Sequence, residues 1–191
     1  DGVRFTTYHH DNNKQGTIAS DLVKAIFTDS QGLTWVGTSN GLQIYDRTNN
    51  IFRDFPLQCP NFNLTPYITS IVESVEEEKL LVSVSGYGIM VYDINNKKLD
   101  IETTERLKDT YNNSYLGNLF TDSKGTIWSH SEQGSFYRLN YSNKKLENII
   151  WGDELAEISK KVVVSAIAED PVNRNMIIGT YNHGIFIFDR A

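Results

Sequence analysis

The sequence predicts an all-β fold made of four copies of one repeating unit. Residues 23–47 and 116–140 share the run Phe-Thr-Asp-Ser-x-Gly, a tryptophan six residues after the aspartate, and a later glycine before an aromatic segment. Residues 68–94 and 164–190 are looser copies of this pattern. The copies follow one another about every 47 residues, and a fixed period of roughly 20 to 50 residues is typical of repeat proteins.

Each unit contains the pattern of four short strands joined by tight turns. In the first unit, the apolar run Val23–Thr28 precedes an Asp-Ser-Gln-Gly turn, whose first and last residues are those that a type I turn prefers. An alternating segment follows the Asn40-Gly41 turn, and a last strand is expected from Ile51 to Phe55. Helical repeats would show an apolar period of about 3.6 residues, a pattern confined here to a predicted short helix at 153–161.

Four antiparallel strands every ~45 residues match one blade of a β-propeller, in which small twisted sheets pack face to face around a central channel. We therefore predict a single propeller segment over residues 1–191. Its blades are expected at approximately 22–56, 67–104, 115–151 and 162–191. The outer strand of the second blade is expected at Leu99–Thr103.

The fourth unit ends after three predicted strands, and residues 3–8 are a candidate for its missing outer strand. Phe5 and Tyr8 repeat the aromatic spacing of Phe52 and Phe55. This segment either completes the last blade, by closing a ring or by pairing across two molecules, or belongs to a blade upstream. An open array would expose apolar blade faces, which favour association. We therefore expect a homodimer with eight blades, the alternative being a closed four-blade monomer.

Composition and charge exclude several classes of function. The net charge is −6, and no run of basic residues is longer than three, so a surface that neutralises nucleic-acid phosphates is not expected. The apolar run Leu80–Ile94 is interrupted by Gly86 and Gly88 and is shorter than the ~20 residues of a membrane helix. The single Cys59 can form neither an intrachain disulfide nor a cysteine-rich zinc cluster, and we predict no metal or other cofactor.

The best-preserved unit carries a specific pattern of glycine, tryptophan and acidic residues. Its members are Val23, Ile26, Asp29, Gly32, Trp35, Val36, Gly37, Thr38, Gly41, Leu42, Tyr45, Asp46, Phe52 and Phe55. The third unit has His130-Ser131 in place of Gly37-Thr38, and the second lacks both the Asp-x-x-Gly turn and the tryptophan. This pattern resembles the two-component regulator propeller repeat, which forms the periplasmic sensor region of Bacteroides-type hybrid two-component systems, composed of a histidine kinase and a response regulator.

The resemblance implies a function as well as a fold. It implies a non-catalytic sensor segment outside the cytoplasm, anchored through other parts of the protein to the inner membrane. Such a sensor would detect an oligosaccharide and regulate transcription of polysaccharide utilisation genes, while histidine kinase activity would lie elsewhere in the protein. Four blades would be a slice of a larger propeller. Two other readings are kept: a scaffold for protein interactions, and a propeller lyase or glycosidase.

Several conspicuous residues are expected to serve the fold. Asp29 and Asp122 are alone in their turns, whereas a calcium loop supplies several acidic ligands, so we expect them to form turns. Trp35 and Trp128 recur in the second strand of two units, which favours packing between blades over stacking on sugars. His130 and His183 lack a nucleophile in a recognisable motif, and we expect surface or turn positions for both histidines. No catalytic residue is predicted.

Candidate ligand-binding residues lie where the units differ from one another. The turns between second and third strands, and the loops that enter first strands, should meet at one mouth of the propeller. Carbohydrate sites combine flat aromatic faces with amide and hydroxyl groups. The residues of this kind at that mouth are Tyr67, Tyr87, Tyr115, Tyr181, Asn182 and His183.

Overall fold

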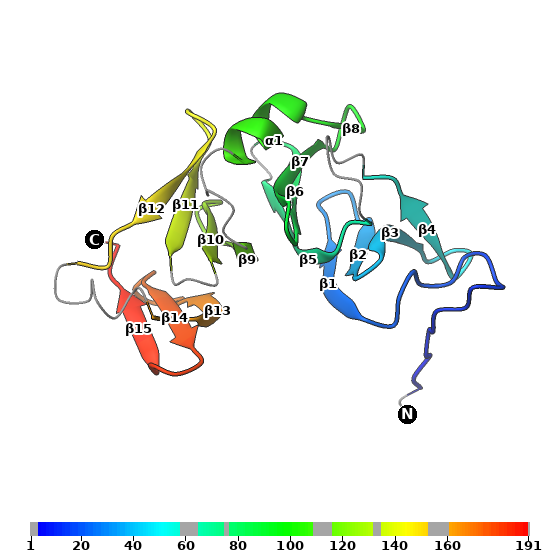
Figure 1. Cartoon of the computed structure of the whole chain (residues 1–191), viewed down its shortest axis with the longest axis horizontal. Coiled ribbons are helices and arrows are strands. Elements are labelled where there is room, and N and C mark those ends of the chain that lie inside the picture. Colours follow the sequence, from blue (N-terminus) through cyan, green and yellow to red (C-terminus); the bar gives the residue numbers. More distant parts are fainter. Residues whose placement is uncertain are drawn as a thin grey trace.

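The computed structural model of the chain describes residues 4–57, 65–74, 77–108, 116–131, 135–152 and 161–190. These residues form four antiparallel sheets, and each sheet consists of strands that are consecutive in the sequence. Figure 1 shows the sheets following one another along an arc, with the first strand of each sheet toward the inside. The predicted all-β architecture of propeller blades is confirmed.

The blades are numbered in sequence order. Blade one contains β1 (Val23–Thr28), β2 (Thr34–Thr38), β3 (Gly41–Asp46) and β4 (Ile51–Phe55). Blade two contains β5 (Ile68–Ser74), β6 (Lys79–Val84), β7 (Gly88–Asp93) and β8 (Lys98–Leu99), followed by helix α1 (Ile101–Lys108). Blade three contains β9 (Leu116–Thr121), β10 (Ile127–Ser131), β11 (Phe136–Asn140) and β12 (Lys145–Ile149). Blade four contains β13 (Val164–Glu169), β14 (Met176–Thr180) and β15 (Ile185–Phe188).

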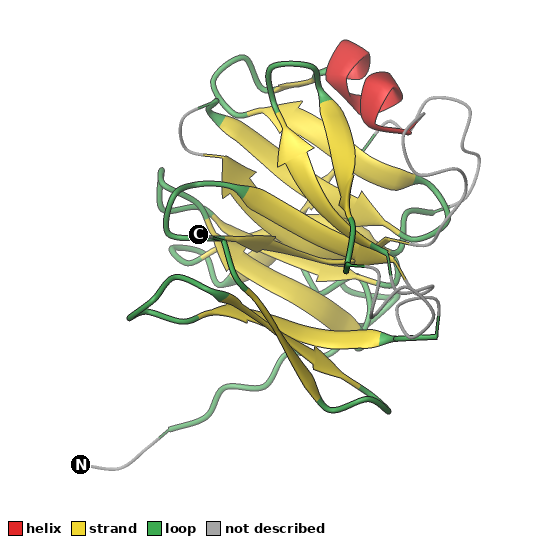
Figure 2. Ribbon diagram, turned by 90° about the vertical axis from the view of Figure 1, so that its left-hand side faces the viewer, coloured by secondary structure: helices red, strands yellow, loops and turns green. Residues whose placement is uncertain are grey.

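The interfaces between blades are apolar, and two of them centre on a tryptophan. Trp35 of β2 packs edge-on against Phe55 and against Tyr92 of blade two, with 5.0 and 6.4 Å between ring centroids. Trp128 of β10 lies 6.0 Å from Phe188 of blade four. Both tryptophans are 2% exposed, which confirms that they pack between neighbouring blades. Figure 2 shows the resulting stack of strands.

The Asp-Ser-x-Gly turns hold these tryptophans in place. Asp29 Oδ1 accepts two backbone N–H groups of its own turn, and Oδ2 accepts the indole N–H of Trp35 at 2.7 Å. Asp122 makes the same set of bonds, with 2.8 Å to the indole N–H of Trp128. The turn-forming role predicted for both aspartates is confirmed.

The serine of each turn joins its blade to the first strand of the next blade. The N–H and hydroxyl of Ser30 both donate to the carboxylate of Glu73 on β5, at 2.7 and 2.5 Å. Ser123 donates in the same way to Glu169 on β13, at 2.7 and 2.9 Å. Arg190 completes the second junction by donating to Glu169 and to the aspartate of that turn. These bonds help to set the position of the inner strands.

Blade two departs from the prediction at its outer strand. β8 is two residues long and is followed by α1, so the strand expected over Leu99–Thr103 is wrong. Asp100 caps the helix, because its Oδ1 accepts the backbone N–H of Thr103 at 3.1 Å. The hydroxyl of Thr104 accepts the N–H of Val91 on β7 at 3.0 Å. The helix thus provides an acceptor for the N–H of Val91, a group that a longer β8 could have bonded instead.

The N-terminal residues lie against blade one and do not complete blade four. Phe5–Tyr8 form no strand, and the Tyr8 ring packs against Tyr45 and Phe52 at 5.7 and 5.2 Å. Figure 1 shows this end of the chain at the opposite end of the arc from β13, β14 and β15. Within one molecule the described sheet of blade four has three strands. The expectation that the N-terminal strand completes this sheet within the molecule is therefore wrong.

The position of Tyr8 repeats a contact that is seen between blades. Phe55 at the end of β4 packs against Tyr92 of the next blade at 4.7 Å, and 37 residues separate these two rings. The same number of residues separates Tyr8 from Tyr45. Tyr8 therefore packs on blade one much as Phe55 packs on blade two. The upstream blade and the pairing across two molecules both stay predictions.

Cys59 and nearly all of the helix predicted at 153–161 lie outside the described residues. In the part of the chain that the structure describes, no helix has the length and apolar character to cross a membrane. The same part holds no group of three or more His, Cys, Asp or Glu side chains placed to bind a metal ion.

Candidate functional site

The first strand of every blade contains an irregularity at the same place. The register with the second strand shifts within residues 23–25 of β1, 68–70 of β5 and 164–166 of β13. In blade three, the shift lies opposite residues 129–131 of β10. A β-bulge of this kind adds one residue to a strand and redirects its side chain. The added residues are Lys24 in β1, Thr69 in β5 and Ser165 in β13.

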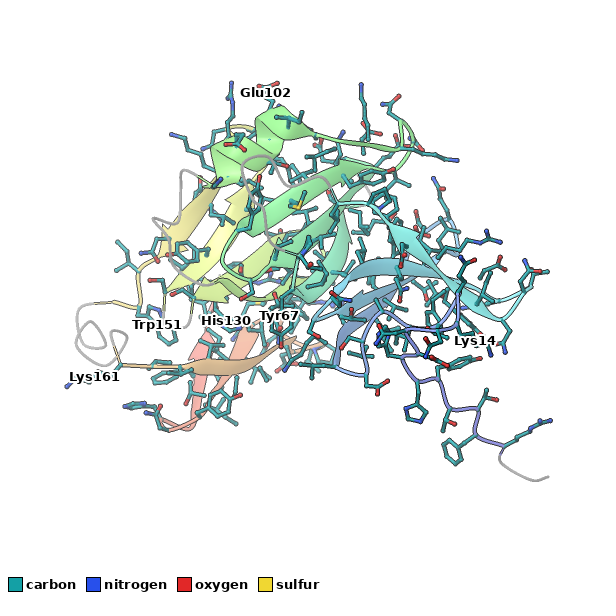
Figure 3. The ribbon with its side chains drawn as sticks, turned by 45° about the vertical axis from the view of Figure 1, so that its right-hand side comes forward. Lys14, Tyr67, Glu102, His130, Trp151 and Lys161 are labelled. Carbon is teal, nitrogen blue, oxygen red and sulfur yellow. The ribbon has the colours of Figure 1, made fainter. Side chains whose placement is uncertain are left out.

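These bulges line one cavity on the inner side of the arc. The cavity has a volume of about 410 Å³ and is reached by all four blades. Its walls are residues 24–26 of β1, 69–71 of β5, 118–120 of β9 and 165–167 of β13, together with His130 of β10. Figure 3 labels His130 at this central position. The cavity thus brings together side chains, such as Lys24 and Ser165, that lie up to three repeats apart in the sequence.

One side chain of the cavity wall also connects two blades. The hydroxyl of Ser70 on β5 accepts the backbone N–H of Leu119 on β9 at 3.0 Å. The same hydroxyl lies 3.4 Å from the carbonyl oxygen of Leu119, to which it donates. Because Ser70 is buried, this pair of bonds holds the inner strands of blades two and three together at the cavity.

His130 occupies a position that holds glycine in blades one and four. At Gly37 a Cβ atom would lie 2.5 Å from Ile68 Cγ2, so the packing of blade two requires glycine there. At Gly179 the nearest atoms would be 3.6 Å away, so a side chain would fit. In blade three the position carries an imidazole, which is 6% exposed and lines the cavity. The surface or turn position expected for His130 is wrong, because the break in the repeat places this ring inside.

The hydrogen bonds of His130 define its protonation state. Its Nε2 accepts the backbone N–H of Asn118 at 3.2 Å, so the proton of the neutral ring lies on Nδ1. Burial lowers the pKa of His130 from its ordinary value of 6.5. Nδ1 has no hydrogen-bond partner among the described residues. The ring is therefore neutral at pH 7.

We expect His130 to make the protein less stable as the pH falls below about 6.5. The pKa of His130 is lower in the folded chain, so between the folded and unfolded values the unfolded chain binds more protons. The free energy of unfolding must then decrease as the pH falls through that range. Urea unfolding at about pH 7.5 and about pH 5 measures this decrease for the wild type and for His130→Gln. A smaller decrease in His130→Gln is expected, and an equal decrease in both proteins would contradict the assignment.

The ligand-binding residues predicted from the sequence lie outside this cavity wall. Tyr181, Asn182 and His183 form the exposed turn after β14, where His183 Nδ1 lies 2.7 Å from Asn182 Oδ1. Tyr67 is half-buried directly before β5, and its carbonyl accepts the N–H of Ser85 at 2.9 Å. Tyr115 lies outside the described residues. The structure thus brings together Asn182 and His183 and leaves the ligand-binding role of these residues a prediction.

Tyr87 is placed differently from the exposed turn residues. It is 5% exposed, and its hydroxyl donates to Glu105 of α1 at 3.4 Å. The ammonium of Lys108 lies 4.5 Å from the centre of the Tyr87 ring. The helix that replaces the predicted outer strand therefore covers Tyr87.

Two signals in the sequence indicate the cavity residues. The second residue of each inner strand is polar or glycine, whereas the first residue is apolar; these second residues are Lys24, Thr69, Gly117 and Ser165, and all but Gly117 line the cavity. The replacement of glycine by His130 is the second signal, since it breaks a motif of the repeat. In a regular strand, side chains alternate between the two faces of the sheet, and this alternation does not reveal where a bulge lies. The two signals therefore mark unusual positions but do not show that these residues share one cavity.

No protein-family model matches the chain, and no curated protein matches it. Among solved structures, it is similar to the extracellular domain of BT4673 from B. thetaiotaomicron, assigned to a one component system, with a TM-score of 0.73 and 20% identity. The extracellular domain of BT3049 from the same organism, assigned to a hybrid two component system, gives a TM-score of 0.71 and 17% identity. The WD40 β-propeller domain of Doa1 gives a TM-score of 0.61 and 11% identity.

These matches establish the fold and show how much of each relative the chain represents. They cover 93% of this chain for BT4673, 97% for BT3049 and 88% for Doa1. The chain spans 22% and 23% of the two B. thetaiotaomicron domains and 51% of the Doa1 chain. The predicted fold class is confirmed: the four sheets of this chain are arranged as consecutive blades of a β-propeller.

Proposed function

We propose that this chain is a ligand-binding segment of a propeller in the extracellular sensor of a two-component system, and that the ligand is an oligosaccharide. The observation that carries the proposal is the cavity, into which inner strands of four blades direct polar side chains. The likeness to the extracellular domains of BT4673 and BT3049 supports the sensor role. The proposal places the chain in the periplasm, with no catalytic activity of its own.

The composition of the cavity suits a sugar. Thr69, Ser70, Asn118 and Ser165 supply hydroxyl and amide groups, and Phe120 with six aliphatic residues supplies apolar surface. Saccharides present hydroxyl groups around apolar C–H faces, so they match this mixture. A sugar that touches several inner strands at once would change the free energy of moving one blade against another. Such a change is a physical basis for a signal that regulates polysaccharide utilisation genes.

The test is binding of saccharides to the chain by isothermal titration calorimetry, using neutral and acidic oligosaccharides of defined length. We expect at least one to bind the wild type, and Ser165→Trp, which places an indole in the cavity, to abolish that binding. Ser142→Trp, at an exposed turn residue of blade three, is the matched control and should bind normally. Circular dichroism of both variants verifies folding. Binding that persists in folded Ser165→Trp would contradict the cavity as the site.

A protein-interaction scaffold is the second candidate, and the exposed face of blade four favours it. Ile185 and Ile187 on β15 are 69% and 68% exposed, and Tyr181 in the turn before β15 is 78% exposed. Large exposed apolar surface marks interaction sites in soluble proteins. Self-association of the chain as a homodimer would cover this face. Light scattering that gives a mass of about 22 kDa at micromolar concentration would exclude the dimer.

A further inference from the structure

We infer that the central cavity selects a sugar acid, so that its ligand is a mono- or disaccharide carrying a carboxylate. This inference rests on the proposed function and names the chemical class of the ligand at the same site. It follows from the charges in the cavity, from the hydrogen bonds that its side chains leave unmade, and from its volume.

The charge of the cavity is opposite in sign to that of the whole chain. The net charge is −6, yet the residues of the cavity wall include the cation Lys24 and no aspartate or glutamate. Among the described residues, no carboxylate lies within 4.0 Å of Lys24 Nζ. Its ammonium is therefore available to an anion that enters the cavity. A neighbouring carboxylate would instead have neutralised it, as Asp93 neutralises Lys79 at 2.6 Å.

The position of Lys24 is set by the backbone. Lys24 is the extra residue of the bulge in β1, at the place that Thr69 and Ser165 take in blades two and four. Regular pairing of β1 would move the register by one residue and reverse the direction of the side chains that follow. The bulge thus directs a cation toward the cavity while Ile26 and Phe27 keep their places in the strand.

The remaining hydrogen-bonding capacity suits the hydroxyl groups of a sugar. Within the described part of the chain, the side chains of Asn118 and Ser165 make no hydrogen bond, whereas Thr69 donates to the carbonyl of Ser83 at 3.3 Å. Asn118 and Ser165 come from blades three and four, so together with Lys24 they offer groups from three sides. A carboxylate on Lys24 with ring hydroxyls on Asn118 and Ser165 satisfies all three at once.

The size of the cavity limits the ligand. Its volume of about 410 Å³ lies near the lower end of the range for small-molecule pockets, roughly 300 to 1,000 Å³. One or two sugar rings fit that volume, and longer chains would extend out of the mouth. Selection by charge would therefore act on a terminal acidic residue or on a free sugar acid.

Ligand-observed NMR titrations of the full 191-residue chain with glucuronate and with glucose test the inference, since these sugars differ by one carboxylate. We expect glucuronate to bind more tightly, and Lys24→Gln to weaken it about tenfold, as expected for one charge-assisted contact, without affecting glucose. Lys145→Gln, an exposed lysine on β12, is the matched control and should leave both affinities unchanged. Ser165→Lys, which adds a second cation but removes the Ser165 hydroxyl, should raise the ratio of glucuronate affinity to glucose affinity.

The outcomes separate this inference from the proposed function. Equal binding of both sugars, unaffected by Lys24→Gln and Ser165→Lys, would overturn the anion selectivity and leave a sugar site in place. If neither sugar binds and no oligosaccharide binds in the calorimetric test, both the inference and the proposed function are overturned. Glucuronate could also bind more tightly than glucose but lose the same affinity in Lys145→Gln as in Lys24→Gln. That result would indicate a general effect of charge and would also overturn the inference.

Discussion

Replacing Asp122 with alanine is expected to lower the free energy of unfolding by about 3 kcal/mol or more. The side chain is fully buried, and it accepts two N–H groups of its turn and the indole N–H of Trp128. It also faces Arg190, whose guanidinium would lose one of its two carboxylate partners. Removal of one carboxylate therefore leaves several buried donors without an acceptor.

The pKa of Asp122 reflects the same environment. Burial alone would raise this pKa, but the hydrogen bonds from Trp128 and from the turn hold it below its usual value. The carboxylate is thus favoured in its charged form in the folded chain. Its contribution to stability is lost when the pH falls through the lowered pKa and the group becomes protonated.

Asp170→Ala is the matched control for Asp122→Ala, because Asp170 begins the equivalent turn in blade four. Its carboxylate accepts one backbone N–H, from Val172 at 2.8 Å, and there is no tryptophan at the corresponding position. We expect a loss of about 1 kcal/mol or less from this variant, measured by urea unfolding with the same slope. Similar losses for Asp122→Ala and Asp170→Ala would show that the indole and Arg190 contacts contribute nothing.

Gly37→Ala is expected to destabilise the chain by about 1 to 3 kcal/mol. The new Cβ would lie 2.5 and 2.9 Å from Cγ2 and Cβ of Ile68, so the inner edge of blade two would have to move. Ile68 is fully buried and cannot turn away into solvent. The effect should therefore appear both as lower stability and as a change at the interface of blades one and two.

Gly179→Ala provides the matched control at the same repeat position. Its Cβ would lie 3.6 Å from the nearest atoms, which is ordinary van der Waals contact, so this variant should be neutral or slightly stabilising. In a double-mutant cycle, Ile68→Ala should relieve part of the cost of Gly37→Ala. Additive effects of Gly37→Ala and Ile68→Ala, or an equal loss in Gly179→Ala, would contradict the blade packing described above.

The sequence predicted the elements of the fold that depend on local chemistry and on the repeat. The Asp-Ser-x-Gly turns and the recurrence of Trp35 and Trp128 correctly indicated hairpins and blade interfaces, because each motif forms its main contacts within a blade or with the next one. Helix α1 was not predicted, although Asp100 provides the N-cap that begins it. The repeat predicts a strand at this position, whereas the N-cap hydrogen bond of Asp100 belongs to the helix that forms instead.

The candidate site was less accessible to sequence reasoning. The sequence pattern predicts aromatic residues in turns as ligand contacts, yet the cavity is built mainly from the inner strands. Lys24, Thr69 and Ser165 reach it because each lies in a bulge, and the alternation of a regular strand does not reveal which residue is the extra one. The absence of a nucleophile motif predicts a surface or turn position for His130, but it says nothing of whether neighbouring blades leave room to bury the ring.

The most direct test of this account is the distance between the inner strands of blades one and four. Spin labels at Lys24→Cys and Ser165→Cys, in a Cys59→Ser background, allow this distance to be measured by double electron–electron resonance. If both residues face one cavity, the distance distribution should be centred well below 30 Å. Sheets stacked in a straight array about 10 Å apart would separate blades one and four by about 30 Å. A distribution centred at or beyond about 30 Å would contradict the convergence of the four blades on one site.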